Sequence, residues 1–89
     1  MANYVFPAIF TKEENAYSVV FPDFEGCYTC GDNLEDAIYM AKDVLALTLF
    51  DYEKEGKEIP SPSDNIVTGE GSIVRDIECD TSEYWKKNA

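Results

Sequence analysis

The sequence predicts an α+β fold in which a small antiparallel sheet carries one long helix on a single face. Three short segments rich in aromatic and β-branched residues lie within the first 30 residues, and polar turns separate them. One long helical pattern follows, and a further strand-like segment lies near the C-terminus. Because the first connections are short, we expect antiparallel pairing, the order β-β-β-α-β and a sheet of three or four strands.

The three N-terminal strands are expected at residues 4–10, 17–21 and 27–30. Pro7 interrupts the first strand and cannot donate a hydrogen bond to a neighbour, so it predicts an edge position or a bulge. Side chains of the second strand alternate with the period of a half-buried strand. A polar turn at residues 12–15 joins these two strands into a hairpin.

The one convincing helix is expected at residues 33–55. Asn33 is a suitable N-cap, acidic residues occupy the first turn, and Gly56 is a natural C-terminal stop. Apolar or small side chains recur at spacings of three and four and form one stripe toward the sheet: Leu34, Ala37, Ile38, Ala41, Leu45, Thr48, Leu49 and Tyr52, widened by Val44, Leu47 and Phe50.

The C-terminal third is expected to begin with an extended connector at residues 57–64, because its two prolines cannot continue a helix. Residues 66–77 are expected to hold one or two strands separated by a hairpin turn at 69–71. Residues 81–89 are predicted to form a short helix or a frayed end.

The chain has a large excess of acidic over basic side chains. Its 89 residues, enough for one domain, carry 18 acidic and 7 basic side chains, a net charge of −11. This field repels nucleic acids and anionic membranes and attracts basic proteins, although acidic charge also keeps a small domain in solution. No apolar stretch approaches the roughly 18 residues of a membrane span. Three cysteines, no histidine and no signal-peptide pattern predict a reduced, cytoplasmic protein.

The cysteines and acids give little indication of catalysis. Cys27 and Cys30 are three residues apart on a predicted strand, so their thiols should point to opposite faces and serve packing. Asp76, Glu78 and Asp80 alternate near the C-terminus and are expected at a solvent-facing edge. Nucleophilic catalysis lacks its usual histidine base, and the chain has no phosphate-binding glycine loop. We therefore predict no catalytic residue, cofactor or metal.

A group of acids surrounds the turn after the second strand and the start of the helix. Each is favourable locally, either in a turn or in the first turn of a helix. The same group can also be interpreted as an acidic rim around Phe24 and Tyr28, suited to a basic protein partner. The candidate contact residues are Asp23, Phe24, Glu25, Asp32 and Glu35.

Three stretches of sequence form a distinctive combination. They are Tyr17-x-Val19-x-Phe21-Pro22-Asp23-x-x-Gly26-Cys27-x-Thr29-x-Gly31-Asp32, then Leu34-Glu35-x-Ala37-Ile38-x-x-Ala41-Lys42-x-Val44-Leu45, then Gly56-x-x-Ile59-Pro60-x-Pro62-Ser63. Together with the first strand they cover about 60 of the 89 residues. This combination resembles the N-terminal domain of the HicB family of type II antitoxins.

The resemblance implies a partial RNase H-like fold and an inhibitor rather than an enzyme. HicB proteins bind HicA toxins, small basic mRNA-cleaving ribonucleases, and cover their active surface. An acidic chain suits this role because it competes with RNA for a basic site. Asp23, Glu25, Asp32 and Glu35 would then pair with Lys or Arg of the toxin, and Phe24 would be an anchor. Homodimerisation is expected from the family and from the broad apolar helix face.

The resemblance also implies a domain division. Residues 1–80 would form the toxin-binding domain, and residues 81–89 would be a tail or the start of the C-terminal DNA-binding module that many HicB proteins carry. We expect no direct nucleic-acid or membrane binding by these 89 residues. Two other functions stay open: a stand-alone HicB-like regulator of another basic protein, and a residual metal-dependent nuclease that uses Asp76 or Asp80.

Overall fold

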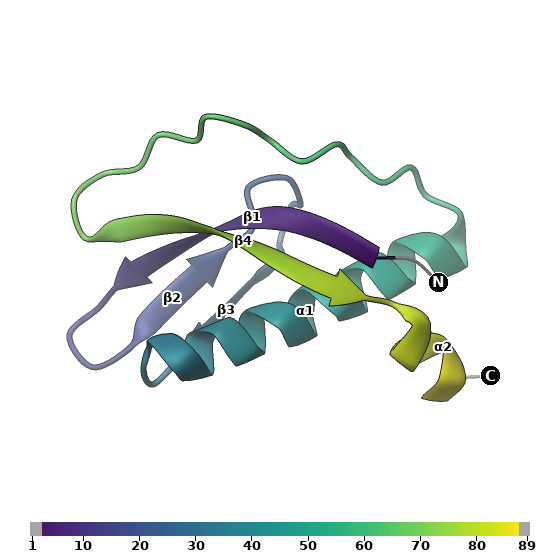
Figure 1. Ribbon diagram of the computed structural model, residues 1–89, viewed down its shortest axis with the longest axis horizontal. Helices are drawn as coiled ribbons and strands as arrows, with labels where there is room; N and C mark the ends of the chain where they lie inside the picture. The colour runs from purple at the N-terminus through teal and green to yellow at the C-terminus, as the bar shows by residue number, and fades with distance from the viewer. Residues whose placement is uncertain (1–2, 88–89) are drawn as a thin grey trace.

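The computed structural model describes residues 3–87, which form a four-stranded antiparallel sheet covered by one long helix. The elements are β1 (Asn3–Lys12), β2 (Tyr17–Val20), β3 (Tyr28–Gly31), α1 (Leu34–Glu55), β4 (Ser72–Asp80) and α2 (Ser82–Lys87). The sheet order is β3-β2-β1-β4. Figure 1 shows α1 on one face of the sheet and the connector, residues 57–71, on the other. The predicted α+β class, the antiparallel sheet and the element order β-β-β-α-β are confirmed.

The central strand β1 has two neighbours along only part of its length. It pairs with β4 from Asn3 to Thr11, whereas its pairing with β2 begins at Ile9. Pro7 therefore lies where β1 has a strand on one side, and a missing N–H donor is tolerated there. β1 lies between β2 and β4 in the sheet, so it is not an edge strand as a whole. At Pro7 itself, however, one side of the strand is unpaired, as the prediction of an edge position requires.

The core lies between the inner face of the sheet and α1. Phe6, Ala8 and Phe10 of β1 point toward the helix, and Val19 and Ile77 join them from the flanking strands. The helix packs small and medium-sized side chains against this face, which lets its backbone approach the sheet closely. Its buried residues are Ala37, Ala41, Leu45, Ala46, Leu49 and Phe50. The main predicted stripe is confirmed, but its expected widening by Leu47 was wrong, because Leu47 is exposed and Ala46 is buried instead.

The corner between β3 and α1 depends on local chemistry. The side chain of Asn33 accepts a hydrogen bond from the backbone N–H of Asp36 over 2.8 Å, as expected of an N-cap. At Gly31, a Cβ atom would lie 2.4 Å from the backbone nitrogen of Ala37. Only glycine therefore fits at this position. The helix ends at Gly56, whose φ of 69° is in the left-handed region.

The C-terminal third differs in one respect from the prediction. A single strand, β4, forms here, and residues 66–68 are not in a strand. Gly71 therefore does not lie in a hairpin between two strands, and that expectation was wrong. The turn instead leads the connector into β4, since the N–H of Ser72 donates to the Gly69 carbonyl over 3.3 Å and the N–H of Lys12 donates to the Gly71 carbonyl over 2.9 Å.

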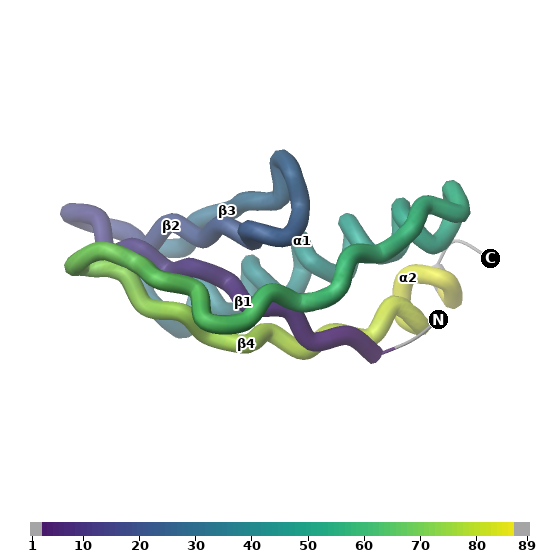
Figure 2. Tube along the Cα trace, turned by 90° about the horizontal axis from the view of Figure 1, so that it is seen from above, coloured from purple at the N-terminus to yellow at the C-terminus, as the bar shows by residue number. Residues whose placement is uncertain are grey.

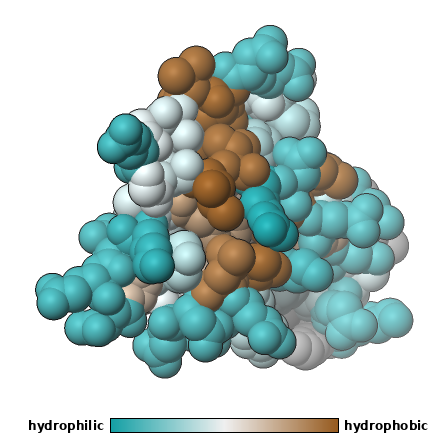
Figure 3. Space-filling model, turned by 60° about the vertical axis from the view of Figure 1, so that its left-hand side comes forward, coloured by the Kyte–Doolittle hydropathy of each residue, from teal (hydrophilic) through white to brown (hydrophobic). Residues whose placement is uncertain are grey.

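The outer face of the sheet is partly covered by the connector, which runs along it close to β1 (Figure 2). Tyr28, Val20, Ile9 and Val74 stand opposite one another across the four strands. Three of these side chains are exposed, Tyr28 by 68%. Figure 3, which turns the left-hand side of Figure 1 toward the viewer, shows a vertical band of hydrophobic groups between hydrophilic ones. No helix among residues 3–87 is long and apolar enough to cross a membrane.

Candidate partner-binding site

The five predicted contact residues fall at opposite ends of β3. Asp23, Phe24 and Glu25 lie in the turn between β2 and β3, whereas Asp32 and Glu35 lie where β3 passes into α1. The strand between them has four residues, a length of about 13 Å at the usual rise per residue. The structure therefore presents two separate acidic groups.

The group in the β2–β3 turn is tied into the fold. Phe24 is only 4% exposed, and its ring packs edge-on against Phe6 at 4.8 Å and Tyr52 at 5.3 Å between ring centres. One carboxylate oxygen of Asp23 accepts a hydrogen bond from the backbone N–H of Ser63 over 3.0 Å, and the other accepts from the Ser63 hydroxyl. Asp23 thus fastens the connector to the turn, and the Phe24 ring supports the turn from inside.

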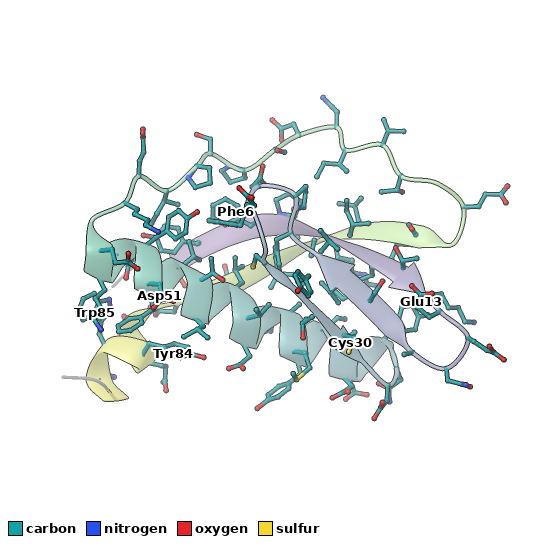
Figure 4. All side chains as sticks on the ribbon, turned by 180° about the vertical axis from the view of Figure 1, so that it is seen from behind. Phe6, Glu13, Cys30, Asp51, Tyr84 and Trp85 are labelled. Carbon is teal, nitrogen blue, oxygen red and sulfur yellow. The ribbon has the colours of Figure 1, made fainter. Side chains whose placement is uncertain are left out.

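The group at the start of α1 is open to solvent and is joined by acids from elsewhere. Asp32 and Glu35 are exposed. A hollow of about 480 Å³ lies between this corner and the β1–β2 turn, and its lining includes Glu13, Glu14 and Asp32. In Figure 4, Glu13 and Cys30 mark this end of the molecule. We call Glu13, Glu14, Asp32 and Glu35 the helix-entrance patch.

Glu13 and Glu14 were not identified from the sequence, where they were interpreted as a polar turn. The signal that could have found them is the hairpin register, because Lys12 pairs with Tyr17 and Tyr17 pairs with Gly31. This register brings the β1–β2 turn to the same end of the sheet as the start of α1. The residues of the patch are brought together by the pairing of β1, β2 and β3, and no local motif predicts it.

A second set of polar contacts lies at the other end of the molecule, where α2 meets α1. Glu53 accepts hydrogen bonds from the Tyr4 hydroxyl and from Nε1 of Trp85, each over 2.7 Å. Burial alone would raise the pKa of Glu53, but the pKa is lowered to about 2 by hydrogen bonds, those from Trp85, Tyr4 and Thr81 included. Glu53 is therefore a charged structural acceptor rather than a proton donor.

The cysteines are free and two of them are buried. Cys27 lies with its sulfur 3.4 Å from the Thr48 hydroxyl, and burial raises its pKa. Burial, followed by the effect of nearby acids, raises the pKa of Cys79 to about 11. Both thiols are therefore neutral packing groups, whereas Cys30 is exposed. The buried and exposed positions agree with the expected divergence of Cys27 and Cys30.

Residues 3–87 bring together no three histidine, cysteine or acidic side chains that could hold a metal ion. Asp76, Glu78 and Asp80 are exposed on β4 and alternate with buried Ile77 and Cys79. This is the solvent-facing edge that the sequence predicted. The described residues give no support to the alternative of a metal-dependent nuclease.

Comparison with known proteins gives a consistent assignment. The family model described as "HicB_like antitoxin of bacterial toxin-antitoxin system" matches residues 6–77. A curated relative, Antitoxin HicB 2 of Photorhabdus laumondii, is 42% identical over 62 residues, which are 68% of this chain and 44% of that protein. The chain therefore spans less than half the length of this relative.

Solved structures show the same fold. A chain of the "Toxin-Antitoxin complex from Streptococcus pneumoniae" is 27% identical, with a TM-score of 0.82 over 93% of this chain and 73% of that one. A chain of the "HicA3 and HicB3 toxin-antitoxin complex" is 25% identical, with a TM-score of 0.68 over 86% of this chain and 99% of that one. The family match over residues 6–77 and the fold shared with these solved structures point to the same family. The chain belongs to the HicB-like antitoxin family.

Proposed function

We propose that this chain is the toxin-binding part of an antitoxin, and that it binds a HicA-like ribonuclease and covers the toxin's active surface. The observation that carries the proposal is the family match over residues 6–77, together with the net charge of −11. Two structural neighbours come from toxin–antitoxin complexes. An acidic surface competes with RNA phosphates for a basic site and is steered toward it.

The helix-entrance patch is the contact surface that we favour. Its acids come from the β1–β2 turn and the start of α1, and all four are exposed. Glu13, Glu14 and Asp32 line one hollow, and Glu35 lines the neighbouring one beside Asn33. Exposed acids can pair with Lys or Arg of a partner, and the one internal side-chain contact among residues 3–87 to give way would be the hydrogen bond that Glu13 accepts from the Ser18 hydroxyl over 3.3 Å. Glu25, also exposed, extends the contact at the other end of β3, where Asp23 and Phe24 hold the turn in shape.

The proposed role is binding rather than catalysis, in the cytoplasm, where the toxin would meet its mRNA. We further propose that the chain makes no direct contact with nucleic acid, because its charge repels phosphates. A homodimer would be formed through surfaces that leave the helix-entrance patch free. Residues 81–89 keep their proposed role as a tail or as the start of a DNA-binding module, although α2 itself packs against α1.

The test is inhibition of RNA cleavage. A HicA-like toxin encoded beside this chain should lose its ribonuclease activity as the chain is added, with complete loss near equimolar amounts. The double variant Asp32→Lys/Glu35→Lys should inhibit at least tenfold less well. The matched control Glu58→Lys/Glu70→Lys makes the same change in net charge on the exposed connector and should inhibit like the wild type. Undiminished cleavage at molar excess would contradict the proposal.

A further inference from the structure

The strand β4 lies at the edge of the sheet, and nothing among residues 3–87 pairs with its outer side. Such an edge presents unpaired backbone N–H and C=O groups that can pair with another chain. Two hydrophobic side chains on β4 are exposed, Ile73 by 43% and Val74 by 39%. The strand therefore offers both backbone hydrogen-bonding groups and apolar contact area to a partner.

A groove of about 320 Å³ lies beside the C-terminal half of β4, where α1 and α2 approach it. The groove is open to solvent rather than enclosed. Apolar and aromatic residues supply part of the lining, and four acids with one lysine supply the rest. The lining residues are Tyr39, Lys42, Asp43, Ala46, Glu78, Cys79, Asp80, Glu83 and Tyr84.

The wall formed by α2 is held in place by contacts with α1. The Tyr84 hydroxyl donates to Oδ1 of Asp43 over 2.8 Å, and the Tyr84 ring stacks on Phe50 with 5.8 Å between ring centres. Trp85 adds its hydrogen bond to Glu53. Figure 4 shows Tyr84 and Trp85 lying at the C-terminal end of α1. Because this wall is already ordered, a partner does not have to order it on binding.

The charges on β4 favour one kind of binding partner at the edge over another. Three exposed acids of β4, Asp76, Glu78 and Asp80, outnumber its one exposed base, Arg75, so a second copy of the chain pairing here would bring mostly like charges close together. The same charges attract Lys and Arg side chains. Charge complementarity therefore favours a basic strand over a second copy.

We propose that the β4 edge and its groove bind an extended basic segment of the HicA-like toxin. The segment adds as a fifth strand along β4, places an apolar side chain in the groove and sets Lys or Arg against Glu78 and Glu83. This inference rests on the proposed function for the identity of the partner. It adds a second contact surface on the side of the molecule away from β3.

The first test is the affinity of the toxin for charge-reversal variants, measured by calorimetry near 150 mM salt. Glu78→Lys/Glu83→Lys changes two exposed side chains and should weaken binding at least tenfold. The control Glu58→Lys/Glu70→Lys makes the same net-charge change away from the groove and should stay within threefold of the wild type. Thermal unfolding of both variants verifies that they fold. Equal affinities for the two folded variants would overturn the inference.

The second test is amide hydrogen exchange of the full chain with and without toxin. The toxin should slow exchange at the β4 amides that face the open edge. If the wild-type chain binds the toxin but exchange slows only near residues 13–35, the inference is wrong and the proposed function stands. If the chain binds no toxin, both are wrong. Concentration-dependent protection of β4 in the chain alone would assign the edge to a second copy and also overturn the inference.

Discussion

Nε1 of Trp85 donates a hydrogen bond to Oε1 of Glu53 over 2.7 Å, which joins two residues 32 positions apart in the chain. The Trp85 ring also meets Phe50 edge-on, with 5.0 Å between ring centres. Phe50 is buried by this contact and by Tyr84. The short helix α2 is therefore packed onto the same domain as α1.

We expect Trp85→Phe to lower the free energy of unfolding by about 1–3 kcal/mol, because an aromatic ring, though a smaller one, is kept but the charged Glu53 loses a hydrogen-bond donor. Urea unfolding followed by circular dichroism measures the change. Tyr28→Phe is the control, since Tyr28 is 68% exposed, and it should change stability by less than about 0.5 kcal/mol. Equal stability of Trp85→Phe and the wild type would show that the contact contributes nothing.

The low pKa of Glu53 predicts a pH dependence of stability. Its folded pKa of about 2 lies below the ordinary value of 4.5, so its contribution is complete above about pH 4.5 and is lost as pH falls toward 2. We expect this loss to be about 1–3 kcal/mol after allowance for partial solvent access. Glu53→Gln should show a shallower decline over the same range. Parallel stability curves for the two proteins would refute this assignment.

Two glycines without positive φ offer a matched pair. Gly31→Ala places a methyl group against the backbone of Ala37 and should destabilise the chain by more than about 2 kcal/mol. At Gly69 an added Cβ meets nothing within 4 Å, so Gly69→Ala should be neutral or slightly stabilising. Thermal unfolding of both variants checks this, and similar melting temperatures would contradict the close approach of β3 and α1.

The contact between Asp23 and Ser63 predicts a local effect. Asp23→Ala removes the acceptor of the Ser63 N–H and should speed amide exchange at Ser63 at least tenfold, with little change in α1. Glu25→Ala, in the same turn, should leave this exchange rate unchanged. If Ser63 exchanges equally in both variants, the connector is held by other contacts.

Most of the fold could be predicted from the sequence because its signals are local. Asn33 and Gly56 bound α1 as expected, and the three- and four-residue spacing of apolar side chains gave its buried face. The pairing of β1 with β4 could not be predicted in this way. The two strands are about 60 residues apart in the chain, so no local pattern indicates that they are neighbours. The short helix α2 was one of two expected outcomes for its segment, and its packing on Phe50 settles its position.

The candidate site could be predicted only in part. Asp32 and Glu35 are exposed as expected, but proximity in sequence wrongly grouped them with Asp23 and Phe24, because β3 separates the two sets. Phe24 lies in a turn, where an aromatic side chain suggests a contact residue, and no local pattern indicates that Phe6 and Tyr52 enclose it. The register of β1, β2 and β3 determines which acids form the helix-entrance patch, because it places Glu13 and Asp32 beside the same hollow.

The central claim is that this acidic chain takes the place of RNA on a basic toxin, and a competition experiment tests it most directly. A catalytically inactive HicA-like toxin is loaded with fluorescent RNA, and the chain is added while anisotropy is recorded. We predict that the chain releases the RNA completely near equimolar amounts, and that added salt weakens both complexes. A stable ternary complex of toxin, RNA and this chain would contradict the account.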